Sequence, residues 1–182
     1  MTKIASAAKS QRFGEQWLNQ HQIGYAGLDQ EDRVAIREFA LLWVIFECQT
    51  LFGDGRIKAM NDYINELVST AEAEERKLLT APFIPHLTYF RDQFVDQKQA
   101  STNDVFDALN FQSEDHKQLV SHALVELSDE TPELLRALLI IVFHIRDCLF
   151  RGLKWRQCNK KQRDDLYHAS KILMKATDMS LA

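Results

Sequence analysis

The sequence predicts an all-α protein, an antiparallel helical bundle with extra short helices. Only six Gly and three Pro interrupt 182 residues. Ala, Leu, Glu, Lys and Gln, which favour helices, dominate long windows, and the apolar side chains recur at helical spacing rather than alternating. Because 46% of the residues are apolar, the chain can bury one sizeable core. We expect a flexible segment over 1–11 and a single domain over 12–182.

Cap residues and helix breakers mark three expected helices in the first half of the chain. The turn Gly53-Asp54-Gly55 ends the first long helix, because glycine adopts the backbone conformations that follow a helix. Pro82 and Pro85 end the next one, because proline has no amide hydrogen to donate. The expected spans are a short helix over 12–21, a long helix from 29 or 32 to about 51, and a helix from 57 to about 79.

The second half contains the most apolar expected helix. The run Asp129-Glu130-Thr131-Pro132-Glu133 places a cap residue before a proline at the first helical position, where the missing N–H of proline costs nothing. The segment from Leu134 to Ile145 is apolar nearly all round, so we expect it to be fully buried or shared with a partner. The expected spans are helices over 86–97, 113–127, 132–151 and 162–178, with a short turn over 103–109.

The end of this apolar helix carries the most informative motif, Arg146-Asp147-Cys148-Leu149-Phe150-Arg151-Gly152. It resembles the signature of the HEPN superfamily, in which an Arg and then a polar residue precede a His, as in R-N-x-L-F-H-G. Segments 39–47 and 164–174 resemble the early apolar helix and the closing helix of such domains. Arg151 stands here at the position of the family's His.

The resemblance implies a helical bundle that commonly dimerises. Many HEPN proteins are metal-independent endoribonucleases of bacterial defence or toxin–antitoxin systems, and others bind without catalysis. The family's Arg binds and polarises the scissile phosphate, while its His transfers the proton needed for attack by the ribose 2′-hydroxyl. Carried over, Arg146 takes the first role, with Asp147 beside it. Arg151 can bind phosphate, but its guanidinium does not release a proton at physiological pH.

Proton transfer therefore needs another residue. His144 is the candidate displaced base, and the alternative is a surface or interface histidine. His168 closes a second five-residue spacing from Arg163, which we interpret as coincidence because it lies inside the last expected helix. The remaining candidates for contact with RNA phosphates and bases are Arg151, Lys154, Trp155 and Arg156. A buried loop position is the alternative for the tryptophan.

A helical wheel at about 100° per residue points Arg146 into the bundle, whereas His144, Asp147 and Arg151 share a more polar arc. A buried guanidinium requires an anionic partner, because its desolvation is costly. Glu47 falls on the apolar arc of the first long helix. We therefore predict a partly buried ion pair between Glu47 and Arg146. The alternative to phosphate binding is that Arg146 serves only this structural pair.

Charge is unevenly distributed along the chain, whose net charge is −4. From position 144 to the end there are nine Lys or Arg and four Asp or Glu, and the segment 146–163 contains seven basic residues and one acidic residue. This local excess suits phosphate. The alternative is a solvated face that meets the acidic stretch 104–133, within the chain or across a dimer.

Several classes of protein are excluded. No apolar stretch approaches the roughly 20 residues that span a bilayer, and the start has no signal-peptide core, so we expect no membrane contact and a cytoplasmic location. Cys48, Cys148 and Cys158 are odd in number, which favours reduced thiols. His144 and Cys148 have ligand spacing, but no second pair completes a metal site. We expect neither metal nor cofactor.

The predicted function is a HEPN-like homodimer that binds RNA or a protein partner, with weakened or lost ribonuclease activity, in a bacterial defence or toxin–antitoxin type of system. One alternative is an active metal-independent endoribonuclease that uses Arg146 with His144 as the displaced base. A second alternative is a helical adaptor with no RNA contact.

Overall fold

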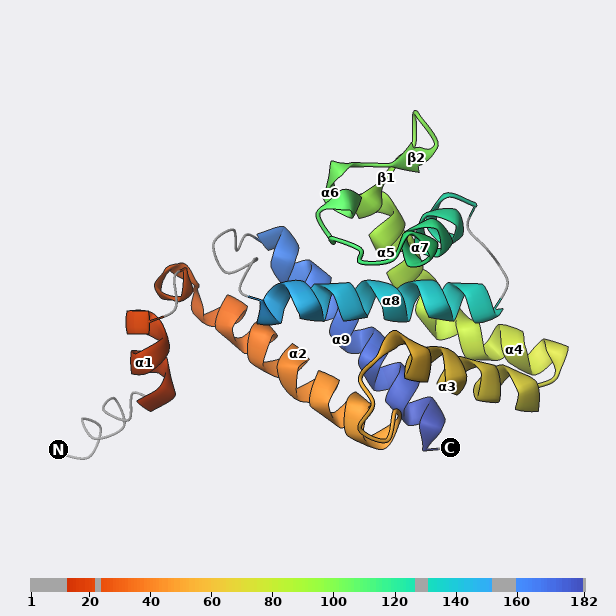
Figure 1. Cartoon of the computed structure of the whole chain (residues 1–182), viewed down its shortest axis with the longest axis horizontal. Helices are drawn as coiled ribbons and strands as arrows, with labels where there is room; N and C mark the ends of the chain where they lie inside the picture. Colours follow the sequence, from red (N-terminus) through yellow and green to blue (C-terminus); the bar gives the residue numbers. More distant parts are fainter. Residues whose placement is uncertain (1–12, 22–23, 127–130, 152–159, 182) are drawn as a thin grey trace, which may run out of the picture.

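The computed structural model describes residues 13–21, 24–126, 131–151 and 160–181, and it confirms the all-α class (Figure 1). The predicted flexible segment 1–11 lies outside the described residues. The elements are the α-helices α1 (Phe13–His21), α2 (Gln30–Gln49), α3 (Ile57–Thr70), α4 (Ala73–Thr80), α5 (Ile84–Phe94), α6 (Asp104–Asp107), α7 (Glu114–Glu126), α8 (Thr131–Phe150) and α9 (Lys160–Ser180), the 3-10 helices η2 (Tyr25–Gly27) and η3 (Ala81–Phe83), and the strands β1 (Val95–Asp96) and β2 (Ser101–Thr102).

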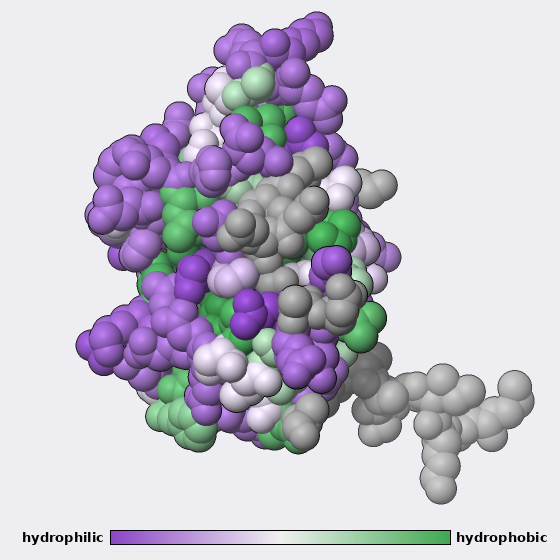
Figure 2. Space-filling model, turned by 90° about the vertical axis from the view of Figure 1, so that its right-hand side faces the viewer, coloured by the Kyte–Doolittle hydropathy of each residue, from purple (hydrophilic) through white to green (hydrophobic). Residues whose placement is uncertain are grey.

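Helix α8 is the centre of the core. None of Leu134, Leu135 and residues 137–142 is more than 4% exposed, because α3, α4, α5, α7 and α9 all contact this helix. The most apolar helix is thus buried within the chain itself. The face of the molecule shown in Figure 2 is mostly hydrophilic, with apolar patches between the polar side chains. None of the helices in the described part combines the length and apolar character needed to cross a bilayer.

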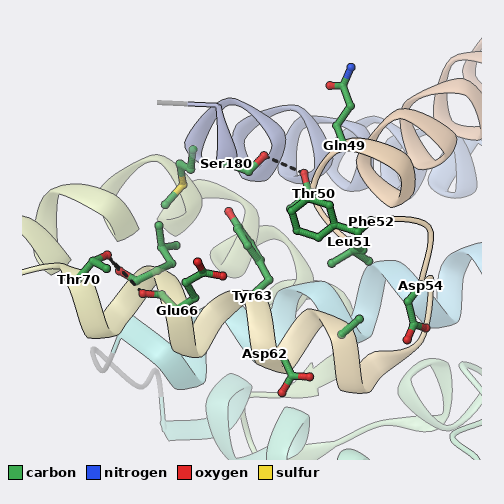
Figure 3. A pocket seen from close by; sticks show the side chains of 13 residues that line it. Gln49, Thr50, Leu51, Phe52, Asp54, Asp62, Tyr63, Glu66, Thr70 and Ser180 are labelled. Carbon is green, nitrogen blue, oxygen red and sulfur yellow. Dashed lines mark hydrogen bonds between the residues drawn. The ribbon is translucent and has the colours of Figure 1, made fainter.

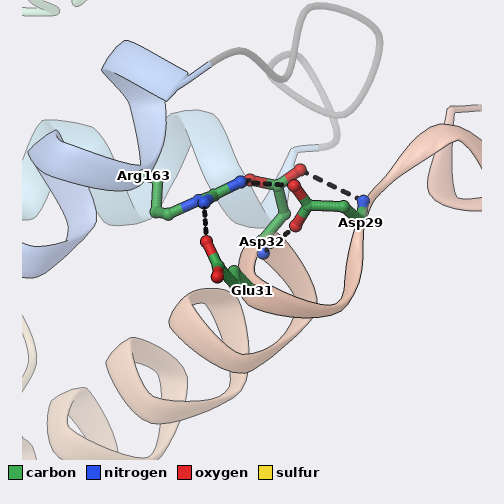
Figure 4. A network of polar contacts seen from close by, with 4 residues as sticks. All are labelled: Asp29, Glu31, Asp32 and Arg163. Atoms are coloured by element: carbon green, nitrogen blue, oxygen red, sulfur yellow. Dashed lines mark hydrogen bonds and ion pairs between the residues drawn. The ribbon is translucent and has the colours of Figure 1, made fainter.

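Helices α2 and α9 pack along most of their lengths, and a polar network joins them at one end (Figure 4). Arg163 of α9 donates hydrogen bonds to Asp32 at 2.9 Å, to Asp29 at 2.6 Å and to Glu31. Asp29 also caps α2, because its carboxylate accepts from the backbone N–H of Asp32 at 2.8 Å while Asp32 returns the interaction. The predicted start of the long helix is therefore confirmed, and one arginine anchors it to α9.

The single helix predicted over 57–79 is wrong, because the chain breaks into α3 and α4 at Ala71. The hydroxyls of Ser69 and Thr70 donate to the carbonyl of Glu66, and such local side-chain bonds compete with the helical ladder. Glu72, the N-cap residue of α4, then forms a capping box with Glu75. The hydroxyl bonds of Ser69 and Thr70 and the cap at Glu72 thus break a helical pattern that is otherwise continuous.

A short antiparallel hairpin also departs from the prediction. Helix α5 ends at Phe94 rather than near position 97, and Val95 pairs with Thr102 in the two-stranded sheet. The hairpin and α6 lie above α5 and α7 in Figure 1. The segment that follows α6 carries Phe111, whose ring packs against His144 of α8.

Candidate functional site

Arg146 lies near the end of α8 in a frame of aromatic rings. Its guanidinium carbon is 5.1 Å from the ring centroid of Trp43, 5.9 Å from that of Phe143 and 5.1 Å from that of Phe150. Trp43 belongs to α2 and is only 1% exposed. A cation over ring faces is attracted by their negative quadrupole, by about 0.5–2 kcal/mol depending on desolvation. The wheel's prediction that Arg146 points toward the bundle is consistent with these contacts.

No acidic side chain compensates this charge in the described part of the chain. The Nε atom of Arg146 is buried and has no hydrogen-bond partner there. Leaving a donor unpaired in this way costs free energy. The guanidinium is thus held by aromatic contacts and keeps its hydrogen-bonding capacity for another acceptor.

The predicted ion pair between Glu47 and Arg146 is not formed among the described residues, and this is a correction. Trp43, one turn before Glu47 on α2, donates its indole N–H to the Oε2 atom of Glu47 at 2.5 Å. On the other side, a Cβ added at Gly55 would lie 2.7 Å from the Cδ atom of Glu47. The carboxylate therefore lies between the indole of Trp43 and Gly55, where an added side chain would force the carboxylate to move. Glu47 orients the ring that contacts Arg146 rather than neutralising the arginine.

Asp147 and Arg151, both predicted site residues, contact each other one helical turn apart. The Nε atom of Arg151 lies 3.0 Å from the Oδ2 atom of Asp147, and the arginine side chain is half exposed. This pair is separate from the aromatic frame of Arg146, as expected from their positions on the wheel. Asp147 partly neutralises Arg151 and leaves it a weaker phosphate ligand than an unpaired arginine.

His144 shares the more polar arc of the wheel, but the alternative that it is a surface histidine is wrong. Its side chain is 2% exposed, and the ring of Phe111, from the segment between α6 and α7, lies 4.4 Å away between centroids. Neither ring nitrogen has a hydrogen-bond partner in the described chain. Burial lowers the pKa of His144 to about 4. A segment distant in sequence thus covers His144, although Arg151 on the same arc of the wheel stays half exposed.

The second five-residue spacing brings no joint site together. Arg163 is occupied by carboxylates of α2, whereas the Nδ1 atom of His168 lies 2.9 Å from that of His86. The ring of His168 also stacks on Tyr89 at 3.8 Å between centroids. Burial and, to a smaller extent, electrostatic repulsion by His168 lower the pKa of His86 to about 4. This histidine pair joins α5 to α9, and no spacing within either helix could have predicted it.

The remaining candidates are partly outside the described residues. Lys154, Trp155 and Arg156 all fall there. Cys148 is buried, and its thiol donates to the carbonyl of Leu109 at 3.7 Å. Within the described ranges, no three His, Cys, Asp or Glu side chains are arranged to hold a metal ion.

Comparison of the chain with protein-family models, with curated proteins and with solved structures finds no match. The chemistry of the site itself therefore carries the functional argument. An unpaired arginine beside aromatic rings can bind an anion and stack against a planar group. His144, on the same helix, is enclosed by Phe111 and lies outside this aromatic frame.

Proposed function

We propose that this chain is a HEPN-like helical protein that binds RNA through its phosphates and has lost, or nearly lost, ribonuclease activity. The observation that carries the proposal is the aromatic frame around Arg146, which holds a guanidinium without an acidic partner among the described residues. We place it in a bacterial defence or toxin–antitoxin type of system, in the cytoplasm.

Phosphate suits this arginine for two reasons. A phosphate oxygen accepts charge-assisted hydrogen bonds from a guanidinium, and these are about twice as strong as neutral ones. Aromatic walls exclude water from part of the group, which strengthens its attraction to an anion. Phe150, which is 51% exposed beside the guanidinium, offers a ring on which an unpaired base can stack.

Loss of catalysis is supported by the enclosure of His144. A general base must reach the proton that it removes, directly or through one water. His144 is instead covered by Phe111, while Arg146 contacts Trp43 on α2. Arg151, at the position of the family's His, cannot replace it because a guanidinium stays protonated.

A homodimer is part of the proposal. Leu41 and Val44, one helical turn apart on α2, are 62% and 53% exposed. Large apolar side chains at the surface favour contact with a partner, and a second copy is the partner that the resemblance implies. Sedimentation velocity of the wild type and of Leu41→Glu tests this. A monomeric wild type at micromolar concentration would refute the dimer without affecting RNA binding.

The central test is binding of a fluorescent single-stranded RNA, followed by anisotropy across a salt series. We expect Arg146→Ala to weaken binding by roughly tenfold or more, the range for a hydrogen bond to a charged group, and to reduce the salt slope by about 0.7. Arg136→Ala is the matched control, because Arg136 lies on the same helix but donates to Asn65. Equal losses in the two variants would contradict the proposal.

The same preparations decide between binding and catalysis when they are incubated with RNA in EDTA. We expect no cleavage by the wild type, and cleavage by Arg151→His would support a disabled nuclease. Cleavage by the wild type that Arg146→Ala abolishes would instead show an active endoribonuclease. Wild type that binds no RNA at low salt would favour the adaptor.

A further inference from the structure

A cavity of about 490 Å³ opens between α3, the turn that follows α2 and the end of α9 (Figure 3). Its volume lies within the range of small-molecule sites. All thirteen lining residues are described, and none of them is Lys, Arg or His. No residue of the aromatic frame around Arg146 lines it, so a ligand here would use a separate site.

Two aromatic side chains form part of its wall. Phe52 is 90% exposed and has a φ of 52°, a left-handed conformation that is strained for a bulky residue. An exposed ring of this kind adds little to the core. Tyr63 is held by donation of its hydroxyl to the carbonyl of Ala176 at 2.8 Å, and burial raises its pKa to about 12, so the phenol stays neutral.

The cavity also contains a carboxylate that no described cation neutralises. Glu66 rises beside Tyr63 from the same helix, whereas the carboxylates of Asp54 and Asp62 point away in Figure 3. Each of these two aspartates already pairs with a basic neighbour, at 2.6 Å and 3.3 Å respectively. Glu66 forms no such pair in the described chain, so the cavity combines one uncompensated negative charge with aromatic walls.

We propose that this cavity binds a small alkylammonium compound, such as a linear diamine. The ammonium group pairs with Glu66, and the methylene chain lies along Leu67 and Met179 while the ring of Phe52 covers it. A carboxylate attracts the charge, an aromatic face attracts the same charge through its quadrupole, and apolar side chains bury the methylenes. An anion is disfavoured because the lining has no basic side chain and carries the charge of Glu66.

Methionine methyl resonances give a direct measurement. Met179 lines this cavity, Met174 lines a different groove and Met60 is buried in the core. Titration with cadaverine should shift the Met179 methyl signal in a saturable way and leave the Met174 and Met60 signals in place. The neutral analogue 1,5-pentanediol should cause no saturable shift. An equal response to both compounds would overturn the proposal, because the charge would then play no part.

Three variants locate the charge and the ring. Glu66→Gln should weaken cadaverine binding by about fivefold, typical of one exposed ion pair. Glu38→Gln, an exposed carboxylate of α2 outside this cavity, is the control and should bind as the wild type does. Phe52→Gly should also weaken binding while raising the melting temperature, since glycine relieves the positive φ. Equal losses in Glu66→Gln and Glu38→Gln would indicate attraction to the overall negative charge and would refute the site.

Discussion

The guanidinium carbon of Arg146 lies 5.1 Å from the ring centroid of Trp43, and this contact joins α8 to α2. The same indole donates its N–H to Glu47 at 2.5 Å. An aromatic ring thus stands where an ion pair was expected. The arginine remains available to an anion, and the carboxylate is satisfied by a neutral donor.

Replacement of Arg146 by an apolar residue should have little effect on stability. We expect Arg146→Met to change the free energy of unfolding by less than about 1 kcal/mol, because it removes a charge that has no acidic partner among the described residues and leaves none of their carboxylates unpaired. Urea denaturation measures this change. Arg163→Met is the contrasting variant, since it strands the carboxylates of α2, and it should lose more. A larger loss in Arg146→Met than in Arg163→Met would show a hidden anionic partner.

Trp43 should tolerate loss of its indole nitrogen better than loss of its ring. Trp43→Phe keeps a ring under Arg146 but removes the donor to Glu47, and we expect a cost of about 1–3 kcal/mol from the unpaired acceptor and the lost volume. Trp43→Ala also opens a cavity, so it should cost about 3–5 kcal/mol. Urea titrations of both variants, with binding of RNA as a second readout, test the order. Similar losses would show that the ring face contributes nothing.

Stability should fall as the pH drops from about 6.5 to about 4. The folded-state pKa of His144 is lowered to about 4 by burial, so below 6.5 the unfolded chain binds a proton that the folded chain does not. The stability that depends on neutral His144 is therefore fully present above pH 6.5, and at most about 3 kcal/mol is lost by pH 4. Urea denaturation between pH 7.5 and 4.5 should show this slope. His144→Phe should reduce it, leaving the parts that arise from His86 and His168, whose pKa values are also lowered by burial.

The cover over His144 can be tested separately. Phe111→Ala removes the ring that lies 4.4 Å from the imidazole, so water should reach His144 and its pKa should rise toward the ordinary value of about 6.5. Titration followed by NMR of the histidine ring protons measures this shift. Phe52→Ala, which removes an exposed ring outside the segment that covers His144, serves as the control. An unchanged titration in Phe111→Ala would mean that other residues keep the site dry.

Local patterns predicted much of the fold. The cap at Asp29 and the apolar run of α8 are features of a few consecutive residues, and the structure confirms both. The break between α3 and α4 was missed because the hydroxyls of Ser69 and Thr70 act against a pattern that otherwise continues. The outcome of this competition depends on which carbonyls the two hydroxyls reach in the folded chain.

For the candidate site too, the sequence predicted some features and missed others. Helical periodicity alone indicated that Arg146 faces the bundle and that Arg151 belongs with Asp147, because residues on one helix keep fixed angular relations. Tertiary structure decided that Trp43, rather than Glu47, contacts Arg146, and that Phe111 encloses His144. A helical wheel gives the direction in which a side chain points, but it does not identify the residue that packs against that side chain. The neighbouring side chain comes from a segment distant in sequence, so only the packing of the helices and loops determines which residue makes the contact.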